Sequence, residues 1–220
     1  MKKNLEEKII QNTIEFVQAE LKNAEGGHDW FHTERVYKNA LLILKQERAN
    51  RLVVILGALL HDIADYKFTG GKEEIGPKKA EVFLKTQQLP QEIIEEVVKI
   101  VENTSFKGGN FQQKWTSKEL EIVQDADRLD AIGAIGIART FNYGGYKNRK
   151  IYDPKIKPNL KMTPEEYKKS TTPTINHFYE KLLLLKDKMN TPTGKKIAKK
   201  RHAFMEGFLK QFYAEWEGKT

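Results

Sequence analysis

The sequence predicts an all-α protein that forms one domain over residues 1–220, and three observations support this. Apolar residues recur at intervals of three and four along most of the chain, which is the spacing of amphipathic helices. No segment shows the strict alternation of apolar and polar residues that is typical of half-buried strands. The length of 220 residues is sufficient for one sizeable hydrophobic core.

The expected helices follow one another along the whole chain. Asp29 is a suitable N-cap for the second of them, and Pro77 and Pro90 suit the first turns of two later ones. The third contains the most hydrophobic stretch, 52–60. In chain order, the periodicity predicts helices over 5–21, 30–44, 50–63, 80–84, 93–101, 117–129, 176–185 and 197–216.

Glycine pairs interrupt this pattern at 26–27, 70–71, 108–109 and 144–145. Glycine adopts left-handed conformations that other residues resist, so these pairs predict helix ends and loops. The segment 143–164 is rich in Gly, Pro, Lys and Tyr and has weak periodicity. We therefore expect a long surface loop there, of the kind that often covers a site as a lid.

Composition limits the classes of function. Cysteine is absent, which excludes disulfides and thiolate metal sites and favours a reducing compartment, so the cytoplasm is the expected location. No apolar run approaches the roughly 18 residues that a membrane span needs, and the N-terminal residues do not resemble a signal peptide.

The formal charge of +8 and the pI near 9.3 favour anionic partners such as nucleotides, polyphosphates or nucleic acid. Lysines on solvated helix faces explain the same excess, and the basic stretch 195–202 has the spacing of such a face. We find no compact patch that interleaves basic and aromatic residues, so nucleic acid is not the expected partner. A protein that associates with RNA or DNA through its positive face stays open as an alternative.

Histidine and aspartate residues on separate predicted helices are the strongest indication of chemistry. They are His32, the adjacent pair His61 and Asp62, and Asp127. Neutral imidazoles and carboxylates without thiols suit a borderline-to-hard divalent cation. A cation held by few protein groups keeps positions for water and substrate, which is the arrangement of a hydrolase site.

Other interpretations of these residues stay open. The His-Asp pair could lie at an exposed helix end beside Lys67, and His32 could be a core histidine. The aspartates of 125–130 could form surface ion pairs with Arg128. The HxxxH spacing of 28–32 could bind zinc alone, but it lacks the glutamate of the HExxH motif.

The ordered set of His32, His61-Asp62 and Asp127 resembles the HD-domain superfamily of metal-dependent phosphohydrolases, and in particular its bacterial YpgQ-like branch. The segments that carry the likeness are 28–36 (HDWFHTERV), 61–65 (HDIAD), 125–131 (DADRLDA) and 177–182 (HFYEKL). The likeness covers nearly the whole chain, with core motifs over 28–130. It implies a helical bundle with a metal site in its core, onto which the C-terminal helices of 173–216 pack.

The resemblance also implies an activity and a site. One divalent ion would be held by His32, His61, Asp62 and Asp127; Mn²⁺ is favoured, and Mg²⁺, Fe²⁺, Ni²⁺ or Zn²⁺ also suits the ligands. The branch is associated with cleaving (deoxy)nucleoside triphosphates to monophosphate and pyrophosphate. Alternatives are a nucleoside monophosphate phosphatase and a non-catalytic nucleotide-binding regulatory module.

Further residues are assigned roles as hypotheses. Asp65 would orient or deprotonate the attacking water, and His28 would donate to phosphate or brace His32. Four basic residues are candidates for holding phosphate, namely Arg35, Lys67, Arg128 and Arg139. The expected partner is a small nucleotide and not a membrane, and the sequence leaves homodimer formation open.

Overall fold

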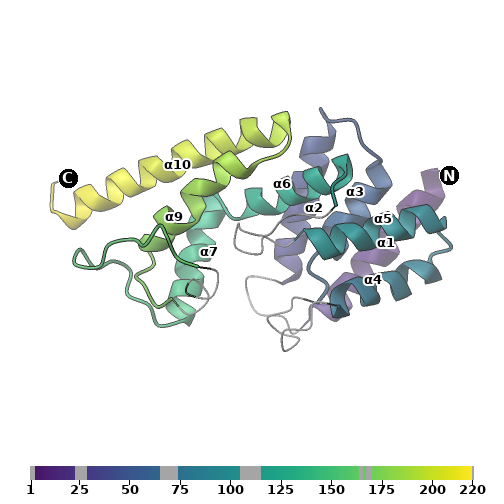
Figure 1. Ribbon diagram of the computed structural model, residues 1–220, viewed down its shortest axis with the longest axis horizontal. Coiled ribbons are helices and arrows are strands. Elements are labelled where there is room, and N and C mark those ends of the chain that lie inside the picture. The colour runs from purple at the N-terminus through teal and green to yellow at the C-terminus, as the bar shows by residue number, and fades with distance from the viewer. Residues whose placement is uncertain are drawn as a thin grey trace. The chain divides into compact units, whose positions relative to one another are not determined.

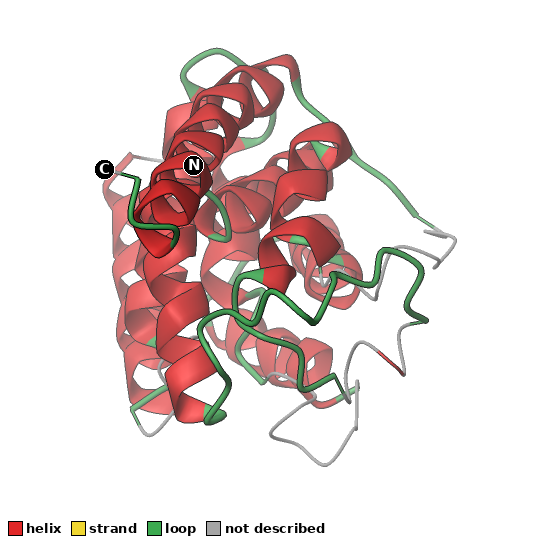
Figure 2. Ribbon diagram, turned by 90° about the vertical axis from the view of Figure 1, so that its left-hand side faces the viewer, coloured by secondary structure: helices red, strands yellow, loops and turns green. Residues whose placement is uncertain are grey.

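A computed structural model describes residues 3–22, 29–64, 74–104, 115–163, 166 and 170–219 (Figures 1 and 2). Helices and connecting segments make up these ranges, which contain no strand, so the predicted all-α class is confirmed. None of the helices in the described ranges combines the length and apolarity that a membrane crossing requires.

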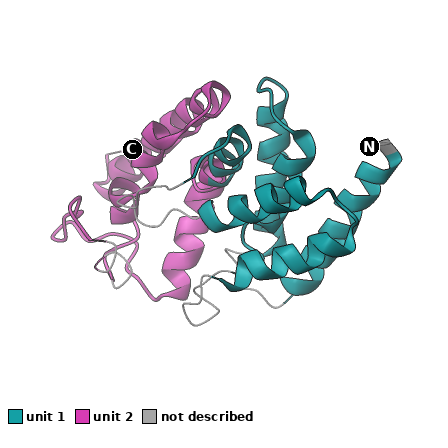
Figure 3. Cartoon of the chain, turned by 45° about the vertical axis from the view of Figure 1, so that its right-hand side comes forward, with its two compact units in different colours: residues 1–127 teal, residues 128–220 magenta. Residues whose placement is uncertain are grey.

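The chain divides into two compact units, Met1–Asp127 and Arg128–Thr220 (Figure 3). The arrangement of one domain over 1–220, with the helices of 173–216 packed on the motif-bearing part, stays a prediction.

The first unit is built around one helix that is buried except for its first residue. It contains α1 (Lys3–Glu20), α2 (Trp30–Leu44), α3 (Arg51–Leu60), α4 (Ile75–Thr86), α5 (Gln91–Asn103) and the part of α6 (Lys118–Asp130) up to Asp127. Helix α3 packs against α1, α2 and α5, and every residue from Leu52 to Leu60 is buried. A helix covered on all sides must be apolar all round, which explains why this stretch is the most hydrophobic of the sequence.

Local signals set the starts of these helices. The carboxylate of Asp29 accepts a hydrogen bond from the His32 amide at 2.9 Å, so the predicted N-cap of α2 is confirmed. Pro90 immediately precedes α5, and Pro77 is the third residue of α4. The predicted third helix is too long, because α3 ends at Leu60 and residues 61–64 form a turn in which the Ile63 amide bonds to the Leu60 carbonyl at 3.1 Å.

The second unit contains a helix that the sequence analysis missed. It consists of α7 (Gly133–Tyr146), α9 (Asn176–Glu180), the 3₁₀ helix η1 (Leu182–Lys188) and α10 (Pro192–Trp216). The glycines of α7 weaken its helical sequence pattern. Gly144 and Gly145 lie inside its last turn and do not end the helix. The predicted loop therefore begins after Tyr146 and not at 143. The predicted helix 176–185 is divided between α9 and η1, and α10 begins five residues before the predicted 197.

The segment that follows α7 is anchored to the rest of this unit. The Thr174 and Ile175 amides donate to the carbonyls of Lys150 and Ile151 at 2.9 and 3.0 Å. The Tyr152 ring packs edge-on against three aromatic rings of α10, with centroid distances of 5.0 to 5.9 Å: Phe212, Tyr213 and Trp216. This segment is thus held in place by aromatic packing and backbone hydrogen bonds.

Gly144 lies against Thr174, so a side chain at this position has no room. A Cβ atom there would lie 2.2 Å from Thr174 Oγ1, whereas a Cβ atom on Gly145 would meet nothing within 4 Å. We expect Gly144→Ala to lower the free energy of unfolding in urea by about 1 to 3 kcal/mol through overpacking. The matched variant Gly145→Ala should be neutral or stabilising by up to about 1 kcal/mol. Equal stability of the two variants would contradict this packing.

The surroundings of His177 lead us to expect that acid destabilises the protein. Burial, with the nearby charges of Lys181 and Arg149, lowers the pKa of His177 from 6.5 to about 3. Between these values the unfolded chain binds a proton that the native chain does not, so stability falls as the pH drops below 6.5. The slope from this residue is at most about 1.4 kcal/mol per pH unit. In urea titrations between pH 6.5 and 4, His177→Gln should flatten the dependence; an unchanged slope would exclude His177 as its source.

Candidate metal centre

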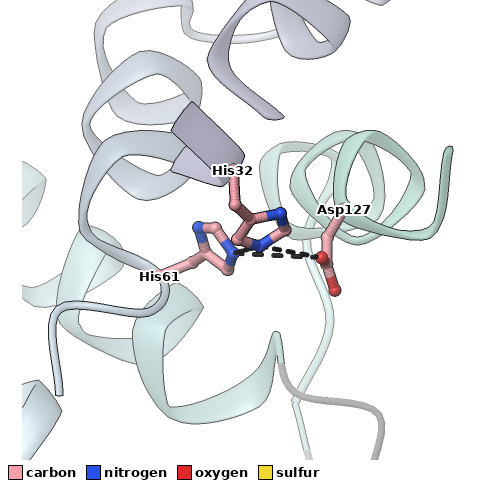
Figure 4. Close-up of side chains that lie close together, drawn as sticks. All are labelled: His32, His61 and Asp127. Carbon is pink, nitrogen blue, oxygen red and sulfur yellow. Dashed lines mark hydrogen bonds and ion pairs between the residues drawn. The ribbon is translucent and has the colours of Figure 1, made fainter. Parts of the chain in front are cut away.

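Two imidazoles meet in the interior of the first unit. His32 lies in the first turn of α2 and His61 is the C-cap residue of α3. Their Nε2 atoms are 3.3 Å apart, and the residues are 1% and 5% exposed (Figure 4). The rings meet edge to face, with centroids 5.3 Å apart. Both histidines therefore direct the same nitrogen at one buried point.

Two carboxylates complete the cluster. Asp62 Oδ2 lies 3.5 Å from His32 Nε2 and 3.6 Å from His61 Nε2. Asp127 Oδ1 lies 3.6 and 3.9 Å from the same two nitrogens (Figure 4). Their side chains are 11% and 27% exposed, more than either imidazole. The cluster thus has a buried nitrogen side and a more accessible oxygen side.

The backbone orients His61. Its Nδ1 lies 2.8 Å from the carbonyl oxygen of Ala58, and a carbonyl can only accept a hydrogen bond. Nδ1 therefore carries the proton, and in the neutral imidazole Nε2 presents a lone pair to the cluster. This is the outer hydrogen bond that fixes the orientation of metal-binding histidines in general.

The donor spacing is that expected of a cation site. Ligand atoms about 2.1 Å from a shared ion lie about 3.0 Å apart at right angles and about 3.4 Å apart in a tetrahedron. The measured separations of 3.3 to 3.9 Å begin near the tetrahedral value and extend slightly beyond it. Among the described residues, His32, His61 and Asp127 form one group whose ligand atoms all lie within 4.8 Å of one another. An oxygen of Asp62 also lies near both imidazole nitrogens of this group. Together the four side chains suit a divalent ion.

Asn39 contributes to the site and was missed by the sequence analysis. It is buried on α2, and its side-chain amide donates to the carbonyl of Ala126 at 3.1 Å. This bond ties α2 to α6 at the residue that precedes Asp127. The available signal was a single amide seven residues after His32, which places both side chains on one face of the helix.

The other aspartates of α6 lie elsewhere. Asp125 is fully buried, and Asp130 forms an ion pair with Arg139 at 2.6 Å. Arg128 donates to the carbonyl of Lys188. Asp127 and Asp130 were expected on one face of their helix, but only Asp127 joins the histidines.

Some of the remaining predicted site residues lie within the described ranges and others lie outside them. Arg35 lies on α2, one turn after His32. The phosphate-binding roles of Arg35, Arg128 and Arg139 stay predictions. His28, Asp65 and Lys67 lie outside the described residues, so their predicted roles stay predictions too.

A pair of variants on α6 tests the centre. Asp127→Ala removes an oxygen donor from the cluster, whereas Asp130→Asn alters the carboxylate that pairs with Arg139. We expect wild type and Asp130→Asn to bind one Mn²⁺ per chain in isothermal titration calorimetry. Asp127→Ala should bind at least about 10-fold more weakly, because loss of a direct ligand exceeds the effect of losing an outer partner. Equal affinity of the two variants would argue against a site at Asp127.

Comparisons with known proteins agree with this geometry. The HD-domain family model matches residues 30–132. YpgQ of Bacillus subtilis is 35% identical over 206 residues, which cover 92% of this chain and 91% of YpgQ.

An HD-superfamily hydrolase from Bacillus thuringiensis has a similar crystal structure, with a TM-score of 0.78, 43% identity and coverage of 96% and 98% of the two chains. The crystal structure of B. subtilis YpgQ in complex with ADP gives a TM-score of 0.77 and 32% identity, and covers 96% of each chain. The chain therefore belongs to the HD-domain family of metal-dependent phosphohydrolases.

Proposed function

We propose that this protein hydrolyses (deoxy)nucleoside triphosphates to the monophosphate and pyrophosphate, at one divalent ion held by His32, His61, Asp62 and Asp127. The main support for the proposal is that two buried imidazole nitrogens lie 3.3 Å apart and that each has an oxygen of Asp62 and of Asp127 within 3.5 to 3.9 Å. The complex of the related YpgQ with ADP supports a nucleotide as the ligand.

The donor set decides which ions fit. Two nitrogens and two oxygens without a thiolate accept Mn²⁺, Mg²⁺, Fe²⁺, Ni²⁺ or Zn²⁺, and we propose Mn²⁺ as the ion. When bound, such an ion supplies Lewis acidity, which activates water and withdraws charge from a phosphoryl oxygen. The Ala58 carbonyl keeps the Nε2 lone pair of His61 directed at the cluster.

The more exposed oxygens of Asp62 and Asp127 form the side at which water and substrate reach the cluster. Phosphate carries several negative charges, so a neighbouring cation must offset them. Arg35 lies three residues after His32 on α2, and its planar guanidinium can donate two parallel hydrogen bonds to phosphate. We assign Lys67 a similar role as a point charge.

Asp65 follows Asp62 by three residues, and we assign it the orientation and deprotonation of the attacking water. We assign His28 a hydrogen bond to a phosphate oxygen. In the reaction, the water oxygen forms a bond to the α phosphorus, and the bond from that phosphorus to the oxygen that bridges it to the β phosphorus breaks. The electron pair leaves with pyrophosphate, and the water proton passes to the carboxylate.

Reaction in ¹⁸O-labelled water tests both the substrate and the bond that breaks. The protein is stripped with EDTA, reloaded with Mn²⁺ and supplied with a panel of triphosphates and monophosphates, and the products are identified by mass. Attack at the α phosphorus places the label in the nucleoside monophosphate and leaves pyrophosphate unlabelled. We expect Asp62→Ala to lower kcat by at least about 100-fold, and Asp187→Ala, an exposed carboxylate of η1, to leave it unchanged.

Several results would contradict the proposal. Orthophosphate released from a monophosphate would identify a monophosphatase. Nucleotide binding without any product would identify a regulatory module. Undiminished turnover by Asp62→Ala would remove the metal cluster from the reaction.

A further inference from the structure

The positive charge of the chain is concentrated in the second unit. Residues 128–220 carry 20 Lys and Arg against 9 Asp and Glu, a formal excess of +11. Residues 1–127 carry 18 against 21, a formal charge of −3. The two values add to the +8 of the whole chain. An asymmetry of this size between the parts of one chain points to a polyanionic partner of the basic part.

Aromatic rings and cations share one surface at the C-terminal end of α7, which we call the Tyr-Lys surface and define as Tyr143, Tyr146, Lys147 and Arg149. The two rings are 47% and 65% exposed, with centroids 6.5 Å apart. Lys147 Nζ lies 4.7 Å from the centroid of Tyr146 and 5.7 Å from that of Tyr143. The Arg149 guanidinium carbon lies 5.5 Å from the Tyr143 centroid. The exposed Lys147 charge therefore lies against both rings, whereas the half-buried Arg149 lies near Tyr143 and also donates to the Ser170 carbonyl.

The helical conformation of α7 creates this surface. Tyr143, Tyr146 and Lys147 stand at positions i, i+3 and i+4, so the last turn and the C-cap bring them onto one face. The residues that follow are fixed by the bonds from Thr174 and Ile175 and by the packing of Tyr152 on α10. The rings are thus presented by an ordered scaffold, which lowers the entropic cost of binding.

Further basic side chains lie in the second unit. Between 143 and 161 the chain has six Lys and Arg and a single acidic residue, Asp153, which pairs with Lys150 at 2.9 Å. On α10, four exposed lysines lie within two turns, and a surface hollow in the same unit is lined by Lys186, Asp187, Lys195 and Lys199. The basic excess over 143–161 suits a strand with repeated phosphates. The lysines of α10 form a separate basic region, because the adjacent Arg201 contacts Gly133 at the opposite end of α7.

We propose that the second unit binds single-stranded nucleic acid through the Tyr-Lys surface, with unstacked bases on Tyr143 and Tyr146 and backbone phosphates on Lys147 and Arg149. Exposed rings can stack only on bases that are not already stacked in a duplex, so a single strand is the fitting partner. This binding is separate from hydrolysis at the metal cluster and does not depend on it.

Fluorescence anisotropy with a labelled oligothymidylate of about 20 nucleotides tests the proposal. The full-length protein is treated with EDTA to prevent hydrolysis. Replacing both tyrosines (Tyr143→Ala with Tyr146→Ala) should weaken binding about 5- to 150-fold for each base that loses its stacking partner. The matched pair Tyr143→Phe with Tyr146→Phe keeps the rings and should bind like wild type.

The salt dependence of binding tests the roles of Lys147 and Arg149 separately. Lys147→Gln and Arg149→Gln should each lower the slope of log affinity against log salt by about 1. Lys85→Gln, an exposed lysine of α4 in the first unit, should leave the slope unchanged. The tyrosine variants should keep the wild-type rate and KM for triphosphate hydrolysis.

Four outcomes would overturn the proposal. They are absence of binding at low salt, equal binding of a duplex of the same sequence, full binding by the Tyr→Ala pair, and displacement of the oligonucleotide by vesicles rich in anionic lipid. A raised KM for triphosphates in the Tyr→Ala pair with unchanged oligonucleotide binding would assign the rings to the nucleotide site instead.

Discussion

The candidate centre depends on the contact between two imidazole nitrogens in the interior of the first unit. The Nε2 atoms of His32 and His61 lie 3.3 Å apart in a place that water scarcely reaches, and His61 presents a lone pair there. Buried polar atoms that face each other require a proton or a cation between them, since an unsatisfied group costs several kcal/mol. The two nearby carboxylates supply the negative charge that makes a divalent cation the better partner.

The surrounding fold fixes this contact from three directions. The Asp29 cap sets the start of α2 and thereby the position of His32. The tightly packed α3 ends directly before His61, and Asn39 joins α2 to α6 next to Asp127. The proposed ligands thus come from three places, namely α2, the end of α3 and α6, and packing of these helices preorganises the centre.

The sequence predicted the parts of the molecule in which one strong local pattern decides the outcome. The four clustered residues were identified because they interrupt apolar helices and resemble a known motif. The first helices were placed from their caps and periodicity. Helix α7 was missed because its glycines oppose a helix locally, whereas Gly144 serves a tertiary contact with Thr174 that no local pattern reveals. The ion pair of Asp130 with Arg139 is likewise a tertiary contact that no local pattern reveals.

The graded exposure of the cluster has a kinetic consequence. Asp127 and Asp62 are 27% and 11% exposed, while the histidines lie behind them. A hydrated cation that arrived from bulk solvent would therefore meet hard oxygen donors before the nitrogens, and would lose its water molecules in steps. Such stepwise dehydration favours ions whose water exchange is fast, so Mn²⁺ would load sooner than the more reluctantly dehydrated Mg²⁺.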